Sequence, residues 1–64
     1  MSEASAALTE DRKREVFAAL VAAQDRGAGV AQSRKDMAER FGITREQVAD
    51  VEREGMDHEW PPLG

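Results

Sequence analysis

Apolar residues recur at helical spacing in three segments of the chain, and a glycine follows each segment. In the first segment, Thr9 can cap a helix, and two acids follow it in the first turn, where the helix dipole favours them. The apolar residues after them share one helical face: Val16, Phe17, Leu20 and Val21. The pattern predicts a helix that runs through Arg12 to about Arg26 and ends at Gly27, a natural C′ residue.

The second segment is predicted to begin at Ser33, after a connecting loop over residues 28–32. Asp36 stands three residues later, which gives a variant of the capping box. The apolar face of this helix consists of Met37, Ala38 and Phe41. Gly42 is expected to end the helix after two turns.

The third segment begins with a complete capping box, in which Thr44 is the N-cap and Gln47 stands three residues later. Val48 and Val51 are predicted to face inward, and Gly55 is predicted to end the helix.

The C-terminal residues contain two prolines, which rule out a continuing helix, and Pro61 favours an extended conformation for Trp60. Two uses of Trp60–Leu63 remain open. The segment can fold back over the helices, or it can serve as a short extended ligand motif for the groove of a partner. Packing is favoured, because a chain of this size has few large side chains with which to build a core.

Composition narrows the possible classes of function. The 64 residues allow one small domain, and the absence of cysteine together with a single histidine excludes a disulfide framework and the usual kinds of zinc site. No nucleophile–base pair and no phosphate loop is found, so we expect no enzyme, no metal and no cofactor. No stretch approaches the ~20 apolar residues of a membrane span. The N-terminus also lacks the pattern of a signal peptide, so a cytoplasmic protein is expected.

The second and third helices, joined by a short turn with a glycine, match the helix-turn-helix. Ala38 is small where the two helices must cross closely, and Gly42 can take the positive φ of a sharp turn. We therefore expect an all-α, compact three-helix helix-turn-helix domain over residues 9–55. A disordered N-terminus (residues 1–8) is expected before it, and an extended C-terminal tail (residues 56–64), packed on the domain, after it.

Residues 36–52 read DMAERFGITREQVADVE. This run resembles the helix-turn-helix of the fourth conserved region of bacterial sigma factors, where Val-Thr-Arg-Glu-Arg-Val-Arg-Gln-Ile-Glu is common after the turn. The matching residues are Thr44, Arg45, Glu46, Val48 and Glu52. The resemblance covers about residues 33–53. It implies a transcription-associated module that binds an upstream promoter element and also touches RNA polymerase.

The geometry of this motif assigns eight candidate DNA-binding residues. They are Arg34, Lys35, Thr44, Arg45, Glu46, Ala49, Asp50 and Arg53. Arg45 and Glu46 are expected to read base edges, because arginine can bond bidentately to guanine and glutamate can accept from cytosine. Arg34 and Lys35 are expected to contact phosphates. For both pairs, the alternative is an ordinary solvated charge.

The balance of charge bears on affinity. The chain has a net charge of −4, and basic and acidic residues are equal in number between Arg34 and Arg53. Because phosphate neutralisation supplies most non-specific affinity, we expect the isolated domain to bind DNA weakly. Specific binding would then require a homodimer or a polymerase-bound state. The alternative function is an acidic protein–protein interaction module on a helix-turn-helix scaffold that no longer binds DNA.

Overall fold

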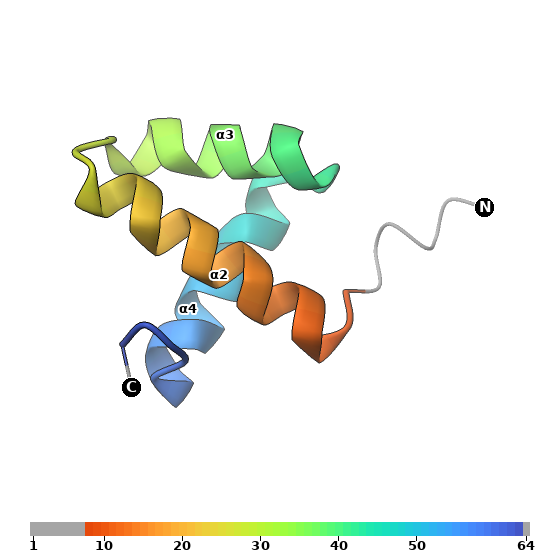
Figure 1. Cartoon of the computed structure of the whole chain (residues 1–64). Coiled ribbons are helices and arrows are strands. Elements are labelled where there is room, and N and C mark those ends of the chain that lie inside the picture. The colour runs from red at the N-terminus through yellow and green to blue at the C-terminus, as the bar shows by residue number, and fades with distance from the viewer. Residues whose placement is uncertain (1–7, 64) are drawn as a thin grey trace.

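The computed structural model describes residues 8–63, and these residues form three helices. Helix α2 spans Glu10–Asp25, α3 spans Val30–Phe41 and α4 spans Arg45–His58. Each helix packs on the other two, and α2 runs diagonally across the molecule between α3 and the end of α4 (Figure 1). Residues 8–63 contain no strand, which confirms the all-α, three-helix fold expected from the sequence.

Both ends of α2 follow the local signals in the sequence. The Thr9 hydroxyl accepts a hydrogen bond from the backbone N–H of Arg12 at 3.1 Å, which is the predicted N-cap. At the other end, Gly27 has a φ of 102°, and the N–H of Ala28 donates to the carbonyl of Ala23 at 3.1 Å. This closing bond is typical of a helix that ends at a glycine in a positive-φ conformation.

Helix α3 begins four residues earlier than predicted, and the assignment of Ser33 as its N-cap is wrong. Gly29 caps the helix, and Ser33 lies inside it with no exposed surface. The Ser33 hydroxyl donates to the carbonyl of Val30 at 2.9 Å and accepts from the side-chain amide of Gln24 on α2 at 3.2 Å. Ser33 therefore joins α3 to α2 instead of starting a helix.

Helix α4 runs past Gly55, so the predicted helix end at this glycine is also wrong. The helix continues to His58 and closes at Glu59, which takes the left-handed conformation with a φ of 52°. The N–H of Trp60 then donates to the carbonyl of Gly55 at 2.9 Å. The predicted tail over residues 56–64 thus contributes its first three residues to α4, and residues 61–62 form a turn instead of an extended segment.

The core lies where the three helices meet. It consists of Val16, Phe17, Leu20, Ala23, Met37, Ala38, Val48, Val51 and Trp60. Trp60 is only 4% exposed and meets the Phe17 ring edge-on, with 6.1 Å between ring centroids. Of the N-terminus predicted to be disordered, Leu8 is partly buried against the core, and residues 1–7 lie outside the described part.

Candidate nucleic-acid interface

The turn between α3 and α4 fixes where the candidate interface begins. Gly42 adopts the left-handed conformation with a φ of 69°, and the N–H of Ile43 donates to the carbonyl of Ala38 at 3.0 Å. Thr44 then accepts from the backbone N–H of Gln47 at 3.0 Å, while the Gln47 side chain accepts from the N–H of Thr44 at 2.9 Å. This reciprocal capping box holds the first turn of α4 in a defined orientation.

Burial on α4 separates an inner from an outer face. Val48 and Val51 are buried, as predicted, and their burial directs the rest of the helix outward. Of the predicted contact residues on or beside α4, all are exposed except Ala49, which is half-buried. These residues are Thr44, Arg45, Glu46, Ala49, Asp50 and Arg53. The capping bond occupies the Thr44 hydroxyl as an acceptor, so this residue positions the helix.

Arg34 on α3 is not a free cation. Its Nε donates to one carboxylate oxygen of Glu52 on α4 at 2.9 Å, and its Nη2 forms an ion pair with the same oxygen, also at 2.9 Å. The Glu52 side chain is only 15% exposed, whereas that of Arg34 is 38% exposed. This ion pair is partly shielded from water. It links the N-terminal half of α3 to the middle of α4 and orients the Arg34 guanidinium toward α4. Sequence reasoning missed the contact, because 18 positions separate the two residues.

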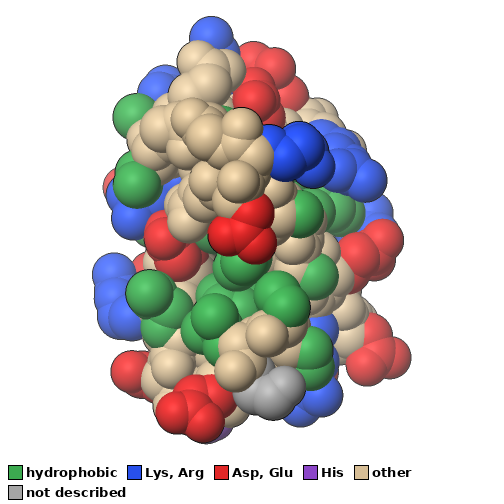
Figure 2. All heavy atoms as spheres, turned by 60° about the vertical axis from the view of Figure 1, so that its left-hand side comes forward, with side chains coloured by type: hydrophobic (Ala, Val, Ile, Leu, Met, Phe, Trp, Pro, Cys, Tyr) green, Lys and Arg blue, Asp and Glu red, His purple; other side chains and the backbone are tan. Residues whose placement is uncertain are grey.

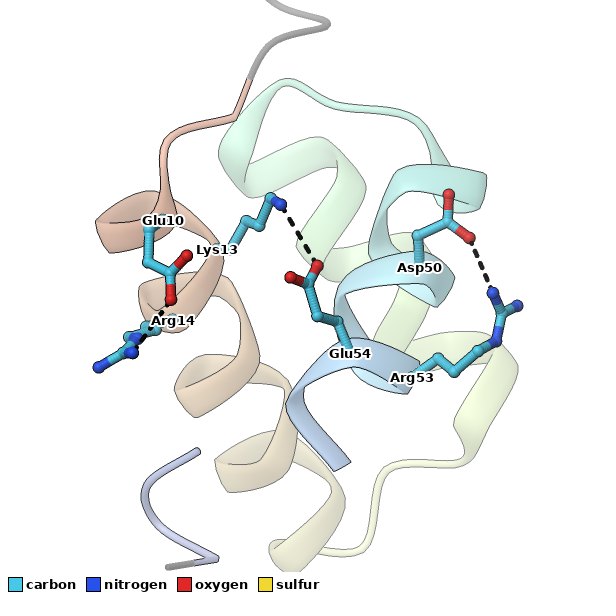
Figure 3. Close-up of polar contacts among 6 residues, drawn as sticks. All are labelled: Glu10, Lys13, Arg14, Asp50, Arg53 and Glu54. Carbon is cyan, nitrogen blue, oxygen red and sulfur yellow. Dashed lines mark hydrogen bonds and ion pairs between the residues drawn. The ribbon is translucent and has the colours of Figure 1, made fainter. Parts of the chain in front are cut away.

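The other charges of the interface are more open to solvent. Arg53 pairs with Asp50 at 3.3 Å on the outer side of α4 (Figure 3), and both side chains are more than 70% exposed. An exposed pair of this kind is weak and screened by salt. Lys35 and Arg45 are exposed and form no ion pair with residues 8–63.

A shallow groove separates α3 from α4 along this face. It consists of two depressions of about 290 and 270 Å³, which share Arg34 and Ala49 in their walls. The first, toward the turn, is also lined by Ala31, Arg45 and Glu46. The second, toward the end of α4, is lined as well by Glu52, Arg53 and Met56. The structure thus brings all the predicted residues except Lys35, Thr44 and Asp50 to one groove.

Residues 8–63 hold no group of three or more histidine, cysteine, aspartate or glutamate side chains placed to bind a metal ion. Within the same range, no helix combines the length and the apolar character that crossing a membrane requires.

Comparison with known proteins adds no relative: no family model, curated protein or solved structure matches the chain.

Proposed function

We propose that the chain is a small DNA-binding, transcription-associated module of the sigma-region-four type, with α4 as its recognition helix. The observation that carries this proposal is the junction of α3 and α4. A left-handed Gly42 and the Thr44 capping box leave Arg45 and Glu46 exposed on the first turn of α4. In helix-turn-helix proteins, the N-terminal residues of the second helix are the ones that reach base edges.

In this proposal, α4 enters the major groove, whose width of about 12 Å admits a helix. Arg45 donates to O6 and N7 of a guanine, and Glu46 accepts from the amino group of a cytosine. Ala49, one turn after Arg45, offers a methyl group to a thymine and keeps the helix close to the bases. Arg34 and Lys35 on α3 contact phosphates, which set the orientation without reading sequence.

Affinity in this proposal is limited by the acids of the same surface. Four cations (Arg34, Lys35, Arg45 and Arg53) stand among three acids (Glu46, Asp50 and Glu52), and two of the cations are already paired. The salt dependence should therefore be shallow, with a slope of roughly −0.9 for each phosphate neutralised. Specific binding then calls for a second contact, from a homodimer or from RNA polymerase.

The test is a backbone-amide NMR titration of the domain with pooled DNA duplexes at low ionic strength. Shifts confined to residues 44–53 and the start of α3 are expected. Arg45→Ala should cost about 1–3 kcal/mol at the preferred base pair, and Lys35→Ala should weaken all duplexes alike. Arg26→Ala is the matched control, because it removes the same charge from an exposed arginine at the end of α2.

A second variant separates weak binding from none. Asp57 and Glu59 are exposed acids at the end of α4, and Asp57→Asn with Glu59→Gln should strengthen non-specific binding by removing repulsion. Glu54 is left in place, because it accepts from Lys13 of α2 at 3.3 Å (Figure 3) and so contributes to packing. If no shift occurs in residues 44–53 even in this variant, the DNA proposal is wrong.

A protein-interaction module is the second candidate, and the near-balance of charge on the candidate interface favours it. A surface with three acids among four cations suits a protein partner as well as it suits a polyanion. If this alternative is correct, DNA duplexes cause no amide shifts in the domain, with or without the acidic side chains at the end of α4.

A further inference from the structure

Two of the largest exposed apolar side chains lie together, away from the turn that begins the candidate DNA interface. Met56 at the end of α4 is 59% exposed, and Leu63 in the C-terminal turn is 51% exposed. Both line one depression of about 110 Å³, together with Phe17 and Val21 of α2. Figure 2 shows hydrophobic side chains gathered on this face of the molecule, with acidic and basic side chains at the margins. We name these four residues the apolar notch.

The notch is built from anchored parts. Phe17 is buried and wedged against Trp60 and Gly55. Leu63 is held by its own N–H, which donates to the carbonyl of Trp60 at 2.8 Å, and Trp60 itself is in the core. Because Phe17 and Leu63 are held in place, these two walls need little ordering when the recess is filled, which favours binding. Its volume suits one aliphatic side chain.

Several acids lie at or next to the residues that line the notch. Gln24 and Glu52 line it, and Asp25 lies four residues after Val21, on the same side of α2. Asp57 and Glu59 follow Met56, and both are exposed. Arg34 compensates Glu52, but none of the other three acids forms an ion pair with residues 8–63.

We propose that the apolar notch docks a helical segment of another protein, with an aliphatic anchor flanked by lysine or arginine. The anchor fills the recess between Val21, Met56 and Leu63, and the flanking cations meet Asp25, Asp57 and Glu59. A second copy of this chain is a poor occupant, because it would bring two sets of these acids together. The proposal does not depend on DNA binding, since none of the four notch residues is a proposed DNA contact.

The probe is a synthetic helical peptide with two leucines one turn apart, flanked by lysines, added to the labelled full chain. Methyl and amide NMR shifts are expected at Val21, Met56 and Leu63. Two matched peptides test the two parts of the proposal: one replaces the lysines by glutamates, and one replaces the leucines by alanines. Both should bind at least about tenfold more weakly than the original peptide, because one loses the charge attraction and the other loses the burial of its anchors.

Leu63→Ser should weaken the lysine peptide about tenfold, since it removes one apolar wall of the notch. Val30→Ser is the matched control: Val30 is 52% exposed, but it lies at the start of α3 and does not line the notch. Absence of shifts at the notch up to millimolar peptide would overturn the proposal. If the glutamate peptide bound as tightly as the lysine peptide, the proposal that the partner is basic would be wrong. If sedimentation showed a dimer of this chain that Leu63→Ser dissociates, the occupant of the notch would be a second copy of the chain and not another protein.

Discussion

A methyl group at Gly55 tests how tightly α4 packs on α2. An ideal Cβ built at this position would lie 2.7 Å from Cγ of Phe17 and closer still to another carbon of the ring. The ring has little room to retreat, because Phe17 is 1% exposed and its other neighbour is the buried Trp60. At Gly27, Gly29 and Gly42, a Cβ would meet no heavy atom within 4 Å, so the clash is specific to Gly55.

Two opposing effects decide the outcome of Gly55→Ala. Inside a helix, alanine is favoured over glycine by about 0.8–1.0 kcal/mol. Overpacking a rigid core costs about 1–3 kcal/mol, and a contact this short lies at or beyond the upper end. We therefore expect a net destabilisation of about 2 kcal/mol. For a domain of this size, that lowers the Tm by roughly 8–16 °C.

Thermal and urea denaturation followed by circular dichroism measure this change. Ala18→Gly, at an exposed position of α2, calibrates helix propensity in the same chain. In a Phe17→Leu background the ring is gone, so Gly55→Ala should become neutral or stabilising, with a coupling of about 1–3 kcal/mol. If Gly55 only ended the helix, the substitution would show no coupling to Phe17. A rise in Tm for Gly55→Ala alone would refute the packing.

Four further substitutions test the turn, the core and the helix ends. Gly42→Val should destabilise the domain strongly, because a β-branched residue resists the positive φ, and a Tm within a degree or two of wild type would contradict the turn. Trp60→Ala should cost about 3–5 kcal/mol, and native tryptophan emission should be blue-shifted and move to the red on unfolding; emission typical of full exposure would exclude core packing. Ser33→Asp would be tolerated at an N-cap, but at this buried site it should cost several kcal/mol in urea denaturation, since the carboxylate would lose its hydration. Glu59→Gly should stabilise the domain by about 1 kcal/mol, seen as a higher Tm, because the left-handed conformation is strained for a side chain.

Local signals in the sequence predicted the parts of the fold that depend on neighbouring residues. The Thr9 cap, the left-handed Gly42 and the capping box of Thr44 with Gln47 each involve residues within a few positions of one another. The outward direction of Arg45 and Glu46 follows from the same signals, once Val48 and Val51 are taken as inner residues.

The errors arose where tertiary packing overrides a local preference. Ser33 has the chemistry of an N-cap, but its hydroxyl accepts a hydrogen bond from Gln24 of another helix. Position 55 requires glycine because the Phe17 ring lies against it. Both neighbours are fixed only after the helices dock, so no local pattern contains them. The pairing of Arg34 with Glu52 likewise depends on how the helices dock, so the sequence predicted only a phosphate contact for Arg34 and not this ion pair.

The two proposed surfaces are centred on opposite ends of α4 and meet at Glu52 and Met56, which line both the groove and the apolar notch. This arrangement bears on the weak charge of the candidate DNA interface. Arg45 lies on the first turn, whereas Met56 and Asp57 lie on the last, beside the apolar notch. A basic partner seated there would cover the acids that repel phosphate and would add cations beside α4. Its binding and DNA binding would then favour each other by the same factor, as linkage requires. If the two proposals hold together, the acidic end of α4 is a disadvantage for DNA binding by the domain alone and an advantage for a complex.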